Sequence, residues 1–399
     1  MKNKNEIKAL PAAERSEGRS AKLEAETSME YLDLEIRPAR VNEYTRLLSW
    51  LDAGLRGRRM GRLAAEYPDV FRADHAREHI VATELSGFAA HAVGRSLAAR
   101  TGAVSFRLGM LGSIYTDAAY RGRGLARACV EAAVAQLAGE GAHAVALWSD
   151  LHAFYARLGF EPAGVENLYR VRRSECEQVL RSLRKPDAVT EFASADGPAL
   201  DALYASKPVA AVRKSGKWEQ RACTPDCTIL VARREEKPIA YAACGRGDDF
   251  SGVVHEWAGE AGGVAACLHA FLEKRSEIVW LTGPIDEEPV PVLRATGARL
   301  HRGFFALLRI TNATALWEEI KRHATVLSET HLSPVGPDGR SYQLRGACGE
   351  RTLQHRELLQ LLFGPHASNA LIGVLSPEAQ TLAREWLPLP LFVWGFDSI

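Results

Sequence analysis

The sequence predicts an α/β (α+β) fold in which a mixed, mainly antiparallel sheet occurs twice in tandem, followed by a small α+β unit. Three observations lead to this prediction. Residues 31–175 show helices, then antiparallel strands, then a strand–loop–helix–strand order. Residues 190–310 repeat that order in weaker form. Residues 311–399 contain a further set of short elements, and a polar tail occupies residues 1–30.

The elements of the first unit follow from hydrophobic periodicity and turn residues. Apolar side chains alternate from Leu32 to Ile36, which predicts a strand, and they recur at helical spacing between Val41 and Leu55. A Ser-Gly turn joins the next two strands as a hairpin. The further elements expected are a helix at 60–67, strands at 79–85, 87–98 and 104–116, a helix at 124–138, a strand at 142–148, a helix at 151–158 and a closing strand within 160–171.

The second unit begins after a charged helix at 175–183 and a break at 184–186. The final unit opens with an amphipathic helix that contains Leu316 and Ile320. The elements expected in these two units are a helix at 199–207, strands at 228–233, 238–245 and 252–257, a helix at 262–274, a strand at 278–282, a helix at 288–296, a single strand at 300–310, short strands around a turn at 336–339, and helices at 354–362 and 377–386.

Composition limits the partners and the compartment. The 50 Lys and Arg are balanced by 49 Asp and Glu, so no excess positive charge favours nucleic acid. No apolar run approaches the roughly 20 residues that span a bilayer, and we expect no membrane partner. The tail at 1–30 is expected to be disordered rather than a secretory signal, and Met29 is a candidate for the true start. Seven scattered cysteines are typical of a reducing compartment, here the cytoplasm.

We expect no metal site. Cys223 and Cys227 form a lone C-x3-C without a second pair at metal-binding spacing. His75, Glu78 and His79 lack a further ligand at matching spacing, so a solvated helix or strand start is the simpler interpretation.

The segment at 121–126, Arg-Gly-Arg-Gly-Leu-Ala, lies where a predicted strand meets a helix N-terminus. Backbone N–H groups are unpaired there and the helix dipole is positive, which suits an anionic pyrophosphate. Gly122 and Gly124 allow close approach, and Arg121 and Arg123 supply charge-assisted hydrogen bonds. An ordinary basic turn is the alternative, but the strand before it and the helix and strand after it fall at the expected distances.

Residues 104–160 resemble the GNAT N-acetyltransferase superfamily. Its Arg/Gln-x-x-Gly-x-Gly/Ala signature is met by Arg121, Gly124 and Ala126, and its Phe-Tyr-x-x-Leu-Gly-Phe motif by residues 154–160. The resemblance implies a GNAT fold with acetyl-CoA as cosubstrate. The residues that it assigns to the pyrophosphate are Arg121, Gly122, Arg123, Gly124, Leu125 and Ala126, and those that it assigns to the pantetheine arm, through main-chain groups, are Ile114, Tyr115 and Thr116.

The resemblance also implies that Tyr155 protonates the leaving thiolate. A tyrosine of reference pKa about 10 stays protonated at neutral pH and can donate to sulfur. The alternative is that Tyr155 only packs beside Phe154. The side chain of Tyr115 is interpreted as a core aromatic, which leaves the role of its main chain unaffected. An attacking amine of pKa about 10.4 is neutral in only about one molecule in 2,500 at pH 7, a cost of roughly 4.6 kcal/mol, so a base or water chain is also expected.

The second unit lacks the pyrophosphate loop, because residues 257–263 contain glycines but no arginine and include Glu260. The tandem arrangement resembles the enhanced-intracellular-survival (Eis) acetyltransferase family over residues 31–399, and residues 304–310 and 356–364 resemble the entry and late helix of its sterol-carrier-like domain. This resemblance implies a symmetric homo-oligomer, such as a hexamer. It also implies that the terminal carboxylate of Ile399 acts as a base through water, unless 387–396 is simply a buried closing strand.

The predicted function is therefore acetyl-CoA-dependent transfer of an acetyl group to a primary amine by direct attack. The acceptor is a small polyamine, an aminoglycoside-like molecule or a lysine. Glu84, Trp148 and Asp150 lie near strand ends beside the expected acceptor site, where shaping that site and ordinary packing are equal alternatives. An alternative from another class is a non-catalytic acyl-CoA-binding sensor or scaffold, against which the intact Tyr155 argues.

Overall fold

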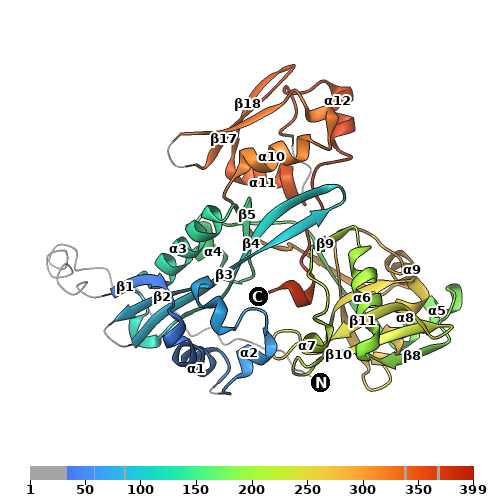
Figure 1. The fold of residues 1–399 in the computed structure, drawn as a ribbon. Helices are drawn as coiled ribbons and strands as arrows, with labels where there is room; N and C mark the ends of the chain where they lie inside the picture. Colours follow the sequence, from blue (N-terminus) through green and yellow to red (C-terminus); the bar gives the residue numbers. More distant parts are fainter. Residues whose placement is uncertain (1–33, 58, 85–86, 337–338, 366–368) are drawn as a thin grey trace, which may run out of the picture.

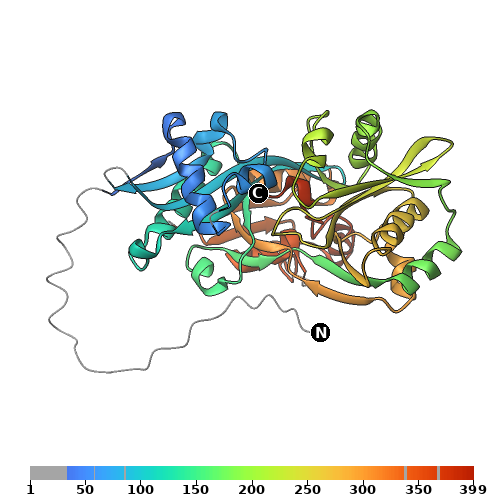
Figure 2. The same cartoon turned by 90° about the horizontal axis from the view of Figure 1, so that it is seen from below.

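The computed structural model describes residues 34–57, 59–84, 87–336, 339–365 and 369–399. The tail expected at 1–30, with Met29, lies outside these residues. Two α/β units lie next to each other, the C-terminal unit packs at one end of the pair, and the last residues of the chain lie between the two α/β units (Figures 1 and 2). The expected fold class, with mixed and mainly antiparallel sheets, is confirmed.

The first sheet has eight strands, which are antiparallel except where β5 runs parallel to β4. In spatial order they are β1 (Leu34–Pro38), β2 (His79–Glu84), β3 (Gly87–Thr101), β4 (Val104–Thr116), β5 (Ala144–Leu147), β15 (Ala306–Ile310) and β6 (Glu161–Ala163), and β9 (Val209–Ala211) pairs with β3 outside this path.

Helices cover both faces of this sheet. Ile80 and Ala82 of β2 pack with α3, whereas Val81 between them packs with α1, because successive side chains of a strand point to opposite faces. The helical elements are 3₁₀ turns at Val41–Glu43, Ala73–Glu78 and Ala118–Tyr120, and the helices α1 (Tyr44–Leu55), α2 (Arg62–Glu66), α3 (Leu125–Gly139) and α4 (His152–Ala156).

β4 and β5 separate in the middle of the first sheet. They pair only where Leu108 to Met110 of β4 lie beside β5. The rest of β4, as far as Thr116, pairs with β3 on one side and has no strand on the other among the described residues. Backbone N–H and C=O groups on that free side can therefore bind an extended ligand as a further strand would.

The second sheet has seven strands, and only β12 and β13 are parallel. In spatial order they are β14 (Arg299–Gly303), β7 (Glu166–Arg172), β13 (Glu277–Thr282), β12 (Val253–Gly259), β11 (Lys237–Cys244), β10 (Thr228–Arg234) and β8 (Ala188–Glu191). The accompanying helices are α5 (Arg173–Ser182), α6 (Gly197–Ala205), α7 (Trp218–Ala222), α8 (Ala261–Phe271) and α9 (Val290–Ala295).

The two sheets exchange strands. β7 precedes residue 175 but belongs to the second sheet, and β15 returns from the end of the second unit to lie between β5 and β6. The single strand expected at 300–310 was therefore wrong, since β14 and β15 lie in different sheets. The chain changes sheet at Phe305, which is buried against Trp148 and Phe392 with ring centroids 5.4 and 5.8 Å away.

The C-terminal unit contains a three-stranded antiparallel sheet. Its elements are α10 (Ala313–Lys321), a 3₁₀ turn at Thr325–Leu327, the strands β16 (His331–Val335), β17 (Ser341–Gly346) and β18 (Gly349–Gln354), and the helices α11 (His355–Phe363) and α12 (Pro377–Ala383). Residues 387–399 then run back between the two α/β units and end beyond a 3₁₀ turn at Gly395–Asp397 (Figures 1 and 2). The leucine, valine and aromatic side chains of this segment are buried, and the segment forms no strand.

Among the helices that the structure describes, none combines the length and the apolar character needed to cross a bilayer.

Candidate active site

The loop before α3 has a backbone that requires glycine. Gly122 and Gly124 have φ angles of 80° and 75°, in the left-handed region that L-residues avoid. A β-carbon at either position would meet no protein atom within 4 Å, so the backbone conformation, rather than space among protein atoms, requires glycine there. Gly124 is the N-cap of α3, and no side chain of the described structure caps that end. The first N–H groups of α3 are thus left for a ligand.

Replacing Gly124 with alanine is expected to weaken CoA binding about 5- to 30-fold, because an L-residue in the left-handed region costs roughly 1–2 kcal/mol. Titration calorimetry with CoA measures this change. Gly139→Ala is the matched control, since Gly139 ends the same helix without a positive φ and an added β-carbon has open space. Equal CoA affinity in Gly124→Ala and wild type would contradict the assignment of the loop.

The two arginines of the loop are exposed and unpaired with carboxylates in the part of the chain that is described. The Nε atom of Arg121 donates to the main-chain oxygen of Thr116 at 3.3 Å, and the guanidinium of Arg123 lies 5.3 Å from the ring centre of Tyr120. The hydroxyl of Tyr120 in turn donates to Glu84 Oε2 at 2.7 Å. The loop therefore carries two guanidinium groups beside a free helix N-terminus, a donor set that fits a pyrophosphate.

The corresponding helix N-terminus of the second unit is covered. A β-carbon on Gly262, in the first turn of α8, would lie 1.9 Å from the main-chain oxygen of Arg184. Glu260, just before this helix, forms an ion pair with Arg234 at 2.7 Å. The chain thus leaves no room for a phosphate at this end of α8 and adds negative charge beside it.

Ile114, Tyr115 and Thr116 lie at the end of β4 where its outer side is free. The ring of Tyr115 points to the α1 side, with its centroid 4.9 Å from that of Trp50 and with Gly54 leaving room for it. The Tyr115 side chain is therefore a packing group, and what these three residues offer a ligand along the free side is their main chain.

Tyr155 lies in α4 with its ring almost fully buried, 4% exposed. The ring meets Phe154 and Phe160 edge-on, with centroids 4.9 and 6.0 Å away. Burial raises the pKa of Tyr155 above its ordinary value, and a hydrogen bond with the Ser149 side chain offsets part of this rise. The hydroxyl stays protonated throughout the neutral range, as a proton donor must.

A cavity of about 470 Å³ opens beside the free part of β4. Its wall includes Gly112 and Ser113 of β4, Trp148 after β5, and residues of the second unit and of the chain end. Three carboxyl groups line it, those of Glu166, Asp249 and Ile399. The cavity therefore joins the place where the two strands separate to an acidic pocket built by both α/β units.

The main-chain carboxyl group of Ile399 lies against Gly112. A β-carbon on Gly112 would lie 2.8 Å from the Ile399 main-chain oxygen, which shows that only glycine lets the two backbones approach so closely. The sequence-based expectation placed this carboxylate in the active site, and the structure puts it in the cavity beside β4.

Buried charges hold the end of the chain in this place. Arg213 donates from Nη1 to Glu256 at 2.8 Å and from Nε to Asp397 at 2.6 Å, and Arg246 donates to Ser398 Oγ at 3.0 Å. Burial alone would raise the pKa of Glu256, but the nearby positive charge, chiefly that of Arg213, lowers the pKa overall and keeps this carboxyl group ionised. Because Arg213, Glu256 and Arg246 belong to the second unit, that unit places the chain end in the cavity.

The three carboxyl groups of the cavity differ in their electrostatics. Arg56 donates to Asp249 at 2.7 Å while it also forms an ion pair with Glu66 at 2.7 Å, and Tyr67 also donates to Asp249. Glu166, at the start of β7, is half-buried, and burial raises its pKa to about 7. A carboxyl group with this pKa exchanges protons near neutral pH.

β4 has a bulge where its pairing with β3 shifts between Tyr115 and Gly112, and a buried pair of histidines supports this bulge. His91 Nδ1 donates to the main-chain oxygen of Ser113 at 2.8 Å, and its Nε2 lies 3.0 Å from Nδ1 of His79. Burial lowers the pKa of His79 to about 3 and that of His91 to about 4, so both rings are neutral. The solvated interpretation of His79 was therefore wrong: its ring is fully buried and contacts His91, which in turn holds the main chain of Ser113, whose φ is 47°.

The sequence located only part of this site. Of the three acceptor-site candidates, Trp148 lines the cavity. Glu84 instead accepts a hydrogen bond from Tyr120, and Asp150 is exposed and does not line the cavity. Sequence reasoning missed Glu166 and Asp249. Each is a single acidic residue in a different unit, and no local motif marks either one.

Comparisons with known proteins agree with this geometry. Residues 45–160 match the acetyltransferase (GNAT) family. No curated protein sequence matches the chain. Three solved structures are similar over 92% of this chain and 100% of theirs: a probable N-acyltransferase of unknown function from Enterococcus faecalis V583 (12% identity, TM-score 0.62), a GCN5-related N-acetyltransferase from Kribbella flavida (16%, 0.61) and Eis1 from Mycobacterium abscessus (17%, 0.57).

At these identities the likeness to the solved structures concerns the fold. The family match covers the separated strands, the glycine loop and the motif that contains Tyr155. Residues 45–160 thus match the GNAT acetyltransferase family, and the fold of the chain is similar to that of Eis1 and of the probable N-acyltransferase.

Proposed function

We propose that this protein transfers an acetyl group from acetyl-CoA to a primary amine that carries further positive charge. The observation that carries the proposal is the acidic cavity of about 470 Å³, which begins at the free side of β4. An acyl donor bound along that side would present its thioester to the cavity. Carboxyl groups of Glu166, Asp249 and Ile399 would attract a cationic acceptor such as a small polyamine, an aminoglycoside or a lysine side chain.

On the donor side, the chain's own groups would bind and orient. The N–H groups of the first turn of α3, with Arg121 and Arg123, would hold the pyrophosphate, and the main chain of Ile114 to Thr116 would align the pantetheine arm. When bound, acetyl-CoA supplies the activated acetyl group as a thioester. These contacts involve no reacting atom, so they act by positioning.

On the acceptor side, the two free carboxyl groups would have different tasks. The main-chain carboxyl group of Ile399 would hold the amine beside Gly112. Glu166, whose pKa is about 7, is better matched to accepting the proton that the amine must lose. As the amine nitrogen bonds to the carbonyl carbon and the carbon–sulfur bond breaks, Tyr155 would donate its hydroxyl proton to the sulfur.

Release of free thiol from acetyl-CoA, followed with a panel of amines, tests the proposed function. The panel consists of a monoamine, a diamine, a polyamine, an aminoglycoside and a lysine peptide. We expect the acceptors with two or more ammonium groups to have the highest kcat/KM, and kcat/KM to fall with added salt as the charge attraction is screened. Absence of thiol release with every amine, despite a thermal shift on adding CoA, would overturn the proposal.

Deleting Ile399 makes Ser398 the last residue and so moves the terminal carboxylate one residue away from Gly112. We expect kcat/KM for the amine to fall about 10- to 100-fold, because a hydrogen bond to a charged group contributes about 1.5–3 kcal/mol. The side-chain contacts of Asp397 and Ser398 remain available to anchor the chain end. Ile399→Val is the matched control, since it keeps the carboxyl group at position 399. If the deletion and the control have the same kcat/KM, Ile399 has no part in the reaction.

A further inference from the structure

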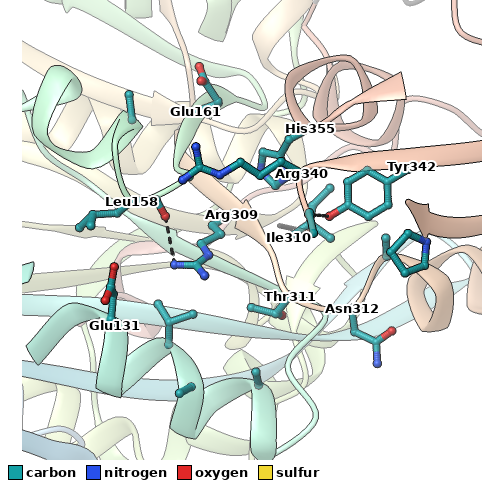
Figure 3. Close-up of a pocket in the computed structure, with 18 of the residues that line it drawn as sticks. Glu131, Leu158, Glu161, Arg309, Ile310, Thr311, Asn312, Arg340, Tyr342 and His355 are labelled. Carbon is teal, nitrogen blue, oxygen red and sulfur yellow. Dashed lines mark hydrogen bonds between the residues drawn. The ribbon is translucent and has the colours of Figure 1, made fainter. Parts of the chain in front are cut away.

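A second cavity, of about 530 Å³, lies between the GNAT domain and the C-terminal unit (Figure 3). One wall is formed by α3, by the chain just after α4 and by the end of β15, and the opposite wall by β17 and the start of α11. None of its lining residues also lines the cavity of about 470 Å³ beside β4. Its size is within the range of about 300–1,000 Å³ that is typical of small-molecule sites.

Positive charge exceeds negative charge around this cavity. Four arginines line it, against two glutamates, Glu131 and Glu161. Glu131 is already engaged, because Arg127 Nε lies 3.1 Å from its carboxylate. The arginines are Arg127, Arg157, Arg309 and Arg340.

Arg309 is the most informative of these side chains. It is half-buried and donates to the main-chain oxygen of Leu158 at 3.0 Å, but no described carboxylate lies within ion-pair distance of it. Burial and the positive charge of Arg340 lower the pKa of Arg309, although Glu131 acts in the opposite direction. Figure 3 shows the guanidinium groups of Arg309 and Arg340 in the same space, approached from two different units.

His355 lies in the same positive potential, and its ring adds a buried polar nitrogen to the cavity wall. Burial, followed by Arg309 and Arg340, lowers the pKa of His355 to about 4. Its Nε2 atom is buried without a well-aligned hydrogen-bond partner among the described residues, although the main chain of Gly159 acts to raise the pKa of the ring. Buried polar atoms without a partner are uncommon and costly, so a ligand that supplies one would be favoured.

We propose that this cavity binds a small phosphorylated molecule, with its phosphoryl group between Arg309 and Arg340 and near His355 Nε2. A phosphate monoester carries a charge of about −1.5 to −2 at pH 7, which matches the excess of two positive charges. The planar guanidinium group also suits phosphate oxygens in paired hydrogen bonds. Because the walls belong to two units, such a ligand would link the GNAT domain to the C-terminal unit.

Titration calorimetry on the full chain, in a buffer free of phosphate, tests this site with inorganic phosphate and with ADP as separate probes. We expect both probes to bind, and Arg309→Ala and Arg340→Ala each to weaken binding at least tenfold. Arg345→Ala is the matched control, since Arg345 is an exposed arginine of the same C-terminal unit, paired with Glu350 at 2.8 Å outside the cavity. Binding of ADP alone would assign the site to nucleotides, and binding of both to the phosphoryl group itself.

Thermal unfolding shows whether each variant is folded. Because the side chain of Arg340 is exposed, Arg340→Ala remains informative even if Arg309→Ala is unstable. Repeating the titrations with saturating CoA separates this site from the donor site. Undiminished binding supports a second site, whereas one-for-one competition by CoA would overturn it. The proposal would also be overturned if neither probe bound to the wild type, or if both cavity variants bound the probes as tightly as the wild type. Both outcomes are independent of the enzyme's acceptor.

Discussion

Replacing Tyr155 with phenylalanine is expected to lower kcat about 10²- to 10⁴-fold, the usual contribution of a positioned general acid, while leaving the Kd for CoA nearly unchanged. The ring of Tyr155 is buried between Phe154 and Phe160, so phenylalanine preserves the packing and removes only the hydroxyl group. Steady-state kinetics with the best amine of the panel, together with calorimetry for CoA, measures both quantities.

Tyr169→Phe is the matched control. Tyr169 is a buried tyrosine of the second sheet, and its hydroxyl accepts a hydrogen bond from Arg294 at 3.1 Å outside the active site. A loss of stability without a loss of kcat is expected there. If Tyr155→Phe keeps a wild-type kcat with normal CoA affinity, another group or water protonates the thiolate. In the wild type, raised pH should lower kcat only above the already raised pKa of Tyr155, because the acid acts in its protonated form.

Replacing Glu166 with glutamine is expected to lower kcat about 10²- to 10⁴-fold at pH 8 and to change the pH dependence. A base acts when deprotonated, so wild-type activity should rise as pH increases through about 7 and then level off. The glutamine variant has no proton to exchange and should lose this rise. The amine itself also titrates, so the quantity to plot is the ratio of wild-type to variant kcat/KM between about pH 5.5 and 9.

Asp249→Asn provides the contrast, because Asp249 lines the same cavity but already accepts hydrogen bonds from Arg56 and Tyr67. This variant should raise KM for the amine and leave the pH dependence in place. A Glu166→Gln variant that changes only KM and keeps the wild-type pH dependence would show that Glu166 binds the acceptor without acting as the base.

The proposed donor side of the site rests on sequence features that are local. The loop at 121–126, the strand before it and Tyr155 after it follow one another along a short stretch, and each has a characteristic residue pattern. The requirement for glycine at 124 also depends on a single backbone angle.

The acceptor side could not be predicted in the same way, because separate parts of the chain build it. Glu166 starts a strand of the second sheet, Asp249 lies in a loop of the second unit, and Ile399 arrives from the far end of the chain. The burial that raises the pKa of Glu166 is a property of the assembled cavity. The prediction of a single strand at 300–310 was wrong for a related reason. An apolar run indicates a strand, but it does not show that its two halves pair in different sheets.

The place of β15 has a consequence for synthesis of the protein. β5 can pair with β4 as soon as residue 147 has left the ribosome, but its other edge pairs with β15, where Leu307 lies opposite Leu147. Most of the second unit must therefore be translated before the GNAT sheet can close. Until then the β5 edge offers unpaired backbone groups to other chains. Nascent chains of this protein should depend on chaperones in the interval between the two strands.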